Sequence, residues 1–187
     1  MRIFIAVLVI IFNLQFWTKA DDIREFEIEN MSLGDSLLDY FSKDFIENNI
    51  DNESNYKSKE FYDISISNHP KFEIYDAVQI SVKNNDKKFL IQGIDGIKVY
   101  EDIDQCLKDR KDIVEELFLL FNNADKYERK KIKHPGYANS FTTDTFLTLS
   151  DENEVIISCY DFSEDIAIND QLRVAMWSKE LNAWLIR

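Results

Sequence analysis

Two blocks of alternating apolar and polar residues, on either side of one long amphipathic stretch, constrain the fold of this chain most strongly. Alternation with a period of two is typical of strands that bury one face. The blocks cover about residues 62–100 and 141–176, and polar turns such as Asn84-Asn85-Asp86 and Asp151-Glu152-Asn153 interrupt them. Strands joined by short turns pair with their neighbours in the sequence, so the pattern predicts an α+β fold with antiparallel meander sheets.

Two main amphipathic helices are predicted beside these strands. The clearer one spans about residues 103–122, where six apolar residues share one stripe: Ile103, Leu107, Val114, Leu117, Phe118 and Phe121. The other spans about residues 32–47 and begins with a capping box formed by Ser32 and Asp35. Between the two helices we expect four strands, because Asp95-Gly96 is a hairpin signal. Three strands follow, which gives the order α-β(4)-α-β(3), and residues 178–187 form a short helix or a strand.

The first twenty residues have the pattern of a secretory signal peptide. Arg2 precedes an unbroken apolar run over residues 3–12, and Ala20 stands where a signal peptidase would cut. A retained membrane anchor is the alternative. Asn13 and Gln15 interrupt the apolar run well short of the ~20 apolar residues that span a bilayer. We therefore expect cleavage and export.

Cleavage would leave residues 21–187, which we expect to form a single α+β domain. The dipeptides His69-Pro70 and His134-Pro135 suggest a weak α-β-β duplication over about residues 32–100 and 103–161. Because the removed segment holds two basic and no acidic side chains, its loss takes the net charge from −13 to −15. This acidic balance argues against binding to nucleic acid or to an anionic membrane surface. We also expect no stable membrane insertion after cleavage.

Export determines how the two cysteines are interpreted. In an oxidising compartment an even pair of cysteines more often forms a disulfide than a metal or redox site, and the chain has no C-x-x-C sequence. We therefore predict a disulfide between Cys106 and Cys159. The competing hypothesis is a cysteine nucleophile beside His69 or His134, which requires one thiol to stay reduced.

One basic cluster stands out in the acidic chain. It falls in a predicted loop over residues 124–139 and consists of Lys126, Arg129, Lys130, Lys131, Lys133 and His134. We interpret this loop as a possible docking site for an acidic protein partner or polyanion. A solvated loop without a partner is the alternative, since charge runs often have no other role.

Common catalytic and cofactor motifs are missing. Four glycines, at positions 34, 93, 96 and 136, form neither a dinucleotide fingerprint nor a phosphate-binding loop. The sequences G-x-S-x-G and H-E-x-x-H are also absent, and no acidic run has the spacing of a calcium loop. We therefore assign no catalytic, cofactor or metal residues. A carboxylate pair for hydrolysis could be assembled from the 35 acidic residues, although no pair stands out.

Three stretches carry a resemblance to other proteins. They are residues 21–28 (DDIREFEI), 31–40 (MSLGDSLLDY) and 178–185 (SKELNAWL). The chain resembles a group of small, secreted, uncharacterised proteins from AT-rich bacterial genomes. The resemblance implies a bacterial origin and a periplasmic address, and it implies no site.

Three hypotheses about function follow. The first is a soluble, non-catalytic periplasmic interaction or accessory protein with a protein partner in the cell envelope. The second is a periplasmic hydrolase that uses a carboxylate pair, or Cys159 with His134. The third is a protein that binds a small ligand in a pocket lined by the sheet.

Overall fold

The computed structural model describes residue 23 and residues 26–51 and 58–186. The predicted signal peptide lies outside the described residues. The elements are a 3₁₀ helix η2 (Leu37–Asp39), α2 (Lys43–Asn48), β1 (Phe61–Ser67), β2 (Ala77–Lys83), β3 (Ile91–Tyr100), α3 (Ile103–Leu120), β4 (Asp125–Lys133), β5 (Phe141–Thr148), β6 (Glu154–Asp161), β7 (Asp170–Trp177) and α4 (Lys179–Leu185). The predicted α+β class with antiparallel strands is confirmed.

All seven strands belong to one sheet, with the order β1-β2-β3-β7-β6-β5-β4. Each strand runs antiparallel to its neighbours. The strands before α3 form one meander and the strands after it form a second. The pairing of β3 with β7 joins the two meanders at the centre of the sheet.

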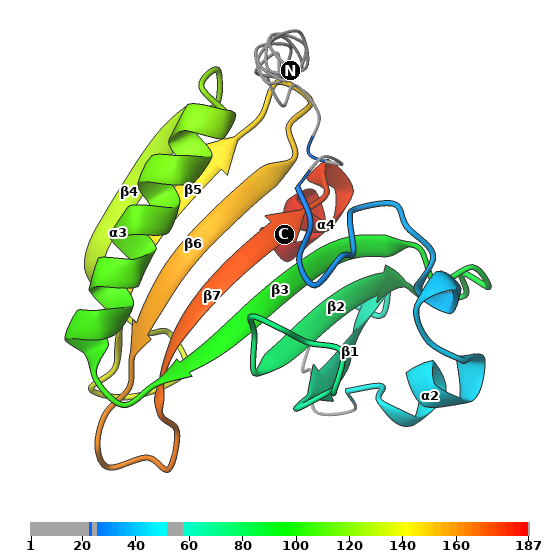
Figure 1. Cartoon of the computed structure of the whole chain (residues 1–187), viewed down its shortest axis with the longest axis horizontal. Coiled ribbons are helices and arrows are strands. Elements are labelled where there is room, and N and C mark those ends of the chain that lie inside the picture. The colour runs from blue at the N-terminus through cyan, green and yellow to red at the C-terminus, as the bar shows by residue number, and fades with distance from the viewer. Residues whose placement is uncertain (1–22, 24–25, 52–57, 187) are drawn as a thin grey trace, which may run out of the picture.

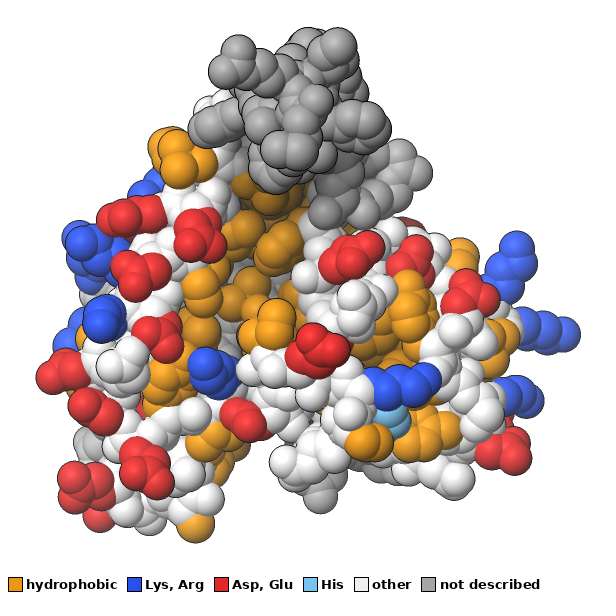
Figure 2. Space-filling view, viewed as in Figure 1, with side chains coloured by type: hydrophobic (Ala, Val, Ile, Leu, Met, Phe, Trp, Pro, Cys, Tyr) orange, Lys and Arg blue, Asp and Glu red, His pale blue; other side chains and the backbone are white. Residues whose placement is uncertain are grey.

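The pleat of the sheet separates its residues into two faces. Ile94, Met176, Val155 and Leu147 are partners across β3, β7, β6 and β5, and all four are buried in the core. That face is covered by α3 and by the N-terminal residues, and α4 lies behind the sheet (Figure 1). We call the side that carries α4 the back face. In front, hydrophobic side chains fill the hollow between α3 and the N-terminal segment, whereas charged side chains cover α3 itself (Figure 2).

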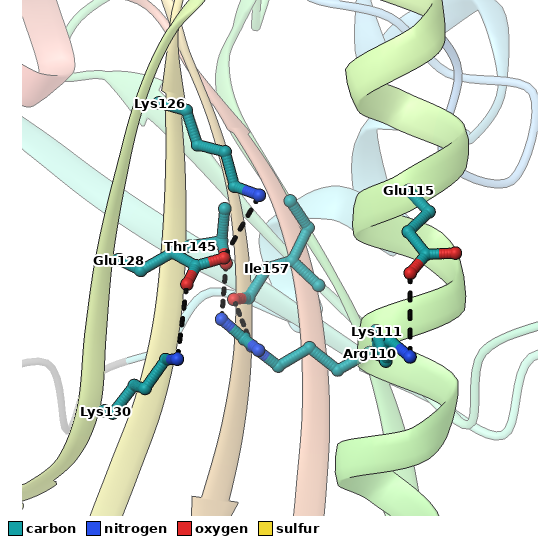
Figure 3. A network of polar contacts seen from close by, with 8 residues as sticks. All are labelled: Arg110, Lys111, Glu115, Lys126, Glu128, Lys130, Thr145 and Ile157. Atoms are coloured by element: carbon teal, nitrogen blue, oxygen red, sulfur yellow. Dashed lines mark hydrogen bonds and ion pairs between the residues drawn. The ribbon is translucent and has the colours of Figure 1, made fainter.

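Two links hold α3 to the sheet. Cys106 in the first turns of the helix forms a disulfide with Cys159 of β6, with their Cα atoms 6.1 Å apart, so the predicted cysteine pair is confirmed. One turn later, buried Arg110 donates to Thr145 Oγ1 and, over 3.3 Å, to the carbonyl oxygen of Ile157. Figure 3 shows its guanidinium reaching from α3 to β5 and β6. Both links therefore fix the helix over the strands that follow it in the sequence.

The predicted first helix over residues 32–47 is wrong. The capping contact exists, because Asp35 Oδ2 accepts from the backbone N–H of Ser32 over 3.0 Å, but no α-helix begins at Ser32. The backbone instead bonds to residues 89–91: Gly34 and Leu37 donate to Ile91 and Phe89. These contacts, distant in the sequence, replace the helical bonds, and only the short η2 and α2 remain.

The predicted strand order is also wrong, since three strands precede α3 and four follow it. Asp95-Gly96 makes no turn, because β3 continues through it and pairs with β2 on one side and β7 on the other. The absence of a side chain at Gly96 instead lets the Tyr75 ring pack closely against β3, since a Cβ at this position would lie 2.7 Å from ring atoms of Tyr75. The predicted loop over residues 124–139 is a strand, β4, over residues 125–133.

Both edges of the sheet are protected from further pairing. Residues 49–51 bond to β1 through Asp51 N–H to Asp63 O and Ser65 N–H to Asn49 O. On the other edge, β4 has a register irregularity between Arg129 and Ile132. The exposed lysines of this strand and its irregularity are features that natural edge strands use to avoid association.

Within the described residues, no helix is long and apolar enough to cross a membrane. The C-terminal residues, for which the sequence left two possibilities open, form the helix α4. Ser178 is its N-cap, and the Ser178 hydroxyl accepts from the N–H of Leu181 over 3.2 Å. The duplication stays a prediction.

Candidate functional site

The largest hollow that we describe lies on the back face of the sheet, opposite α3. It has a volume of about 890 Å³, and β3 to β7 line it together with the end of α4. We call this hollow the back-face pocket. Its volume lies in the range of roughly 300–1,000 Å³ that is typical of sites for small ligands.

Strand register arranges the pocket lining in parallel rows. Arg173, Ser158, Asp144 and Arg129 are successive partners across β7, β6, β5 and β4 and form an ionic row. Two residues along each strand, the partners Ala175, Ile156, Phe146 and Tyr127 form an apolar row. The pocket floor therefore has charged groups directly beside an apolar strip.

Arg129 lies at the β4 end of the ionic row. Its Nη2 is 3.0 Å from Asp144 Oδ2, and the Asp144 side chain is only 4% exposed. The guanidinium lies over the Phe146 ring, 4.6 Å from its centroid, which adds a cation–π contact. Its Nε atom is buried and has no hydrogen-bond partner among the described residues. Because an unpaired buried donor is costly, this atom is a position where a ligand acceptor would be favourable.

Arg173 lies at the β7 end of the same row. Its guanidinium lies 4.9 Å from the centroid of the Tyr160 ring. Nε and Nη2 donate to Gln171 Oε1 over 3.3 and 3.2 Å. No carboxylate forms an ion pair with Arg173 in the described part of the chain, so its charge is not neutralised by direct contact.

His134 lines the pocket beyond the ionic row. Its Nδ1 accepts from the backbone N–H groups of Gly136 and Tyr137 over 3.0 and 3.2 Å. The neutral ring therefore carries its proton on Nε2. Burial lowers the pKa of His134, and the nearby charge of Arg173 lowers it further, which keeps this neutral form dominant. The ring packs against Tyr160, with the centroids 5.7 Å apart.

Asp95 of β3 lies at the opposite side of the pocket, next to Trp177. The indole N–H of Trp177 donates to Asp95 Oδ1 over 2.8 Å. Burial raises the pKa of Asp95 to about 6, although the Trp177 hydrogen bond and the charge of Arg173 oppose this shift. The carboxyl therefore gains and loses its proton in the range of mildly acidic solutions.

Helix α4 closes one end of the pocket because it packs directly on β3. Asn182, Leu185 and Ile186 from this end of the chain line the hollow. The contact requires a glycine: a Cβ at Gly93 would overlap Leu181 Cδ2 and lie 3.2 Å from Trp177 Cδ1.

Replacing Gly93 by alanine is therefore expected to loosen α4 and to lower the free energy of unfolding by about 1 kcal/mol. Hydrogen exchange at the α4 amides would measure the loosening. Gly136→Ala is the control, because a Cβ there has no neighbour nearer than 3.5 Å. Unchanged exchange in α4 of the Gly93→Ala variant would contradict this account of how the helix is held.

The predicted basic cluster is divided by the pleat of β4. Lys126 and Lys130 approach Glu128 on the α3 side of the sheet, with N–O distances of 3.1 and 3.9 Å (Figure 3). Arg129, Lys133 and His134 line the back-face pocket. The six residues therefore do not form one continuous surface, and their role in docking a partner stays a prediction.

The remaining lining residues were not identified from the sequence. Asp95, Asp144, Tyr160 and Arg173 lie on four different strands, and only the strand register brings them to one face. The sequence indicated these residues only as positions that alternate with the buried apolar residues along each strand. Such residues are equally typical of an ordinary solvated face.

The described residues contain no group of three or more His, Cys, Asp or Glu side chains that could hold a metal ion. Both cysteines are in the disulfide, which leaves the hypothesis of a cysteine nucleophile without its free thiol. Comparisons with protein-family models, curated proteins and solved structures found no match to this chain.

Proposed function

We propose that this protein is an exported, non-catalytic binding protein whose back-face pocket holds a small molecule. The observation that carries the proposal is a hollow of about 890 Å³ whose lining includes a buried, unpartnered Arg129 Nε. The expectation of export rests on the sequence of residues 1–20, and the periplasmic address rests on the resemblance to secreted bacterial proteins. The disulfide is compatible with that destination, since disulfides persist in oxidising compartments.

A rigid scaffold supports binding at this site. Of the strands that form the floor of the pocket, β3, β7, β6 and β5 pair on both sides and β4 pairs with β5, and the disulfide and Arg110 attach α3 to the opposite face. Binding groups on strands of a sheet lose little conformational entropy when a ligand arrives. The pocket is therefore suited to hold a ligand without a large rearrangement.

The positions of the acidic groups favour binding over hydrolysis. Asp95 has the raised pKa of a general acid, but two strands separate it from Asp144. Three strand spacings correspond to about 14 Å between backbones. Glycoside hydrolysis uses carboxyl groups roughly 5–9.5 Å apart. In addition, Asp144 is already paired with Arg129.

A pocket-filling variant tests the proposal. Ile156 lies in the centre of the apolar row, so Ile156→Trp would occupy the space above the floor. We expect at least one compound from a panel of envelope metabolites to raise the Tm of the wild type. At a concentration a hundredfold above Kd the rise should be about 5 °C or more. The same compound should not stabilise the Ile156→Trp variant.

Leu119→Trp is the matched control, because it adds the same side chain at an exposed position of α3 on the other face. This variant should respond to the compound as the wild type does. The proposal fails if no compound of the panel stabilises the wild type, or if the stabilisation survives in Ile156→Trp while the variant remains folded by circular dichroism.

A further inference from the structure

We infer that the ligand of the back-face pocket is an amphipathic anion, with a carboxylate or phosphate group over the ionic row and an apolar body over the apolar row. This inference rests on the proposed function and adds the chemical class and the orientation of the ligand. It follows from three features of the pocket: its hydrogen-bond donors, its charge and its apolar strip.

The pocket has more unused donors than unused acceptors. Arg129 Nε has no partner, and the His134 Nε2–H and the Tyr160 hydroxyl form no hydrogen bond within the described parts of the chain. Each carboxylate of the lining already accepts through one oxygen: Asp144 Oδ2 from Arg129 and Thr142, Asp95 Oδ1 from Trp177, and Glu154 Oε1 from Thr148. A complementary ligand must therefore supply acceptors, as an oxyanion does.

The charge of the ionic row also favours an anion. Asp144 balances Arg129, which leaves Arg173 without a directly paired carboxylate. The Tyr160 hydroxyl lies close to these groups, because the charges of Arg173, Asp95, Asp144 and Arg129 all affect its pKa. Each guanidinium lies over an aromatic ring. The N–H groups that do not already bond to Asp144 or Gln171, among them the buried Arg129 Nε, remain available to carboxylate or phosphate oxygens.

The apolar strip gives the ligand its direction. From Ser158 in the ionic row, β6 continues through Ile156 toward the end of the pocket that α4 closes. Four residues of strand correspond to about 14 Å. Along this distance the floor is lined by Ala175, Phe146 and Trp177, and Leu185 contributes from α4, while Glu154 and Thr148 lie beside Trp177 at the far end. An apolar chain or ring attached to the anion would therefore be buried between β6 and α4.

Titration calorimetry with four eight-carbon probes tests the inference: octanoate, monooctyl phosphate, octanol and octylamine. We expect one or both anions to bind at least about tenfold more tightly than octanol, because hydrogen bonds to charged groups contribute about 1.5–3 kcal/mol each. Acetate should bind far more weakly than octanoate, because it lacks the apolar body. The ratio of the two anions shows which oxyanion the pocket prefers.

Two double variants with equal loss of charge show where the anion binds. Arg129→Gln with Arg173→Gln should remove the advantage of the anions over octanol. Lys126→Gln with Lys130→Gln should preserve it, because these lysines lie on β4 but on the α3 side (Figure 3). Proton NMR of the His134 ring should shift when the anion binds to the wild type and not to the arginine double variant.

The outcomes separate this inference from the proposed function. If octanol or octylamine binds as tightly as the anions, and Ile156→Trp abolishes this binding, the pocket binds ligands and the anionic class is wrong. The class is also wrong if the lysine and arginine double variants behave alike. If no octyl probe binds but a metabolite still stabilises the wild type and not Ile156→Trp, the proposed function stands and this inference fails.

Discussion

Replacing Cys106 and Cys159 by alanine is expected to lower the free energy of unfolding by about 3–4 kcal/mol. The disulfide closes a loop with a sequence separation of 53 residues, so its removal restores a large amount of chain entropy to the unfolded state. Both sulfur atoms lie in the core, where the two side chains are at most 1% exposed. Urea denaturation of the variant and of the oxidised wild type would measure the difference.

The denaturant slope distinguishes this mechanism from a simple loss of packing. Without the cross-link the unfolded chain exposes more surface, so the m-value should rise together with the loss of stability. Val114→Ala is the control, because it removes buried atoms from the same helix and leaves the disulfide intact. Equal m-values and a stability within about 0.5 kcal/mol of the oxidised wild type would show that the cross-link has no such role.

The disulfide also matters for the site on the other face. Cys159 lies on β6 between Ser158 and Tyr160, whose side chains point into the back-face pocket. Successive residues of a strand face opposite sides, so the cross-link fixes the backbone on which two lining residues depend. The double alanine variant is therefore also expected to bind the ligand of this pocket less tightly at temperatures near its Tm.

Patterns in the sequence predicted the strands and α3 because interactions between residues near one another in the chain determine these elements. Period-two alternation marks β5 and β6 directly, and the apolar stripe over residues 103–122 marks α3. The cysteine pair could be predicted because the expected export leaves few other roles for two cysteines. For the strands and α3, the neighbouring residues contain the necessary information.

The errors arose where contacts distant in the sequence determine the backbone. The stretch over residues 32–47 has helical spacing, but Gly34 and Leu37 bond to the backbone of residues 89–91 instead. Asp95-Gly96 has the composition of a turn, yet β2 and β7 pair with it on both sides. For β4, a run of charged residues concealed a strand, because one of its faces carries Glu128, whose charge acts on Arg110, and the other lines the pocket.

The candidate site was the least predictable feature. Of its lining residues, the sequence indicated Arg129, Lys133 and His134, and it did so for a different reason, as parts of a basic loop. The ionic row exists only because β4, β5, β6 and β7 pair in one particular register. A shift by one residue in any of these pairs would move at least one residue of the row to the α3 face.

Replacing Asp95 by asparagine is expected to stabilise the protein at pH 7 by about 2–3 kcal/mol. The pKa of Asp95 is raised to about 6 in the folded protein, mainly by burial, whereas an unfolded chain has a value of about 3.9. Below about pH 4 the carboxyl is protonated in both states and contributes no difference. As the pH rises from about 4 to 6, the unfolded state loses its proton first, so the stability of the wild type falls and then levels off.

Asparagine removes this ionisation and keeps the local geometry, because its Oδ1 can still accept from the Trp177 indole. The free energy of unfolding of Asp95→Asn should therefore lack the decline between about pH 4 and 6 that the wild type shows. Asp112→Asn is the control with an equal change of charge, since Asp112 is exposed on α3, and it should differ from the wild type by no more than about 0.5 kcal/mol. A difference in stability between the two proteins that stays constant from about pH 4 to 7, or an Asp95→Asn variant less stable than the wild type at pH 7, would mean that Asp95 ionises without cost in the folded protein.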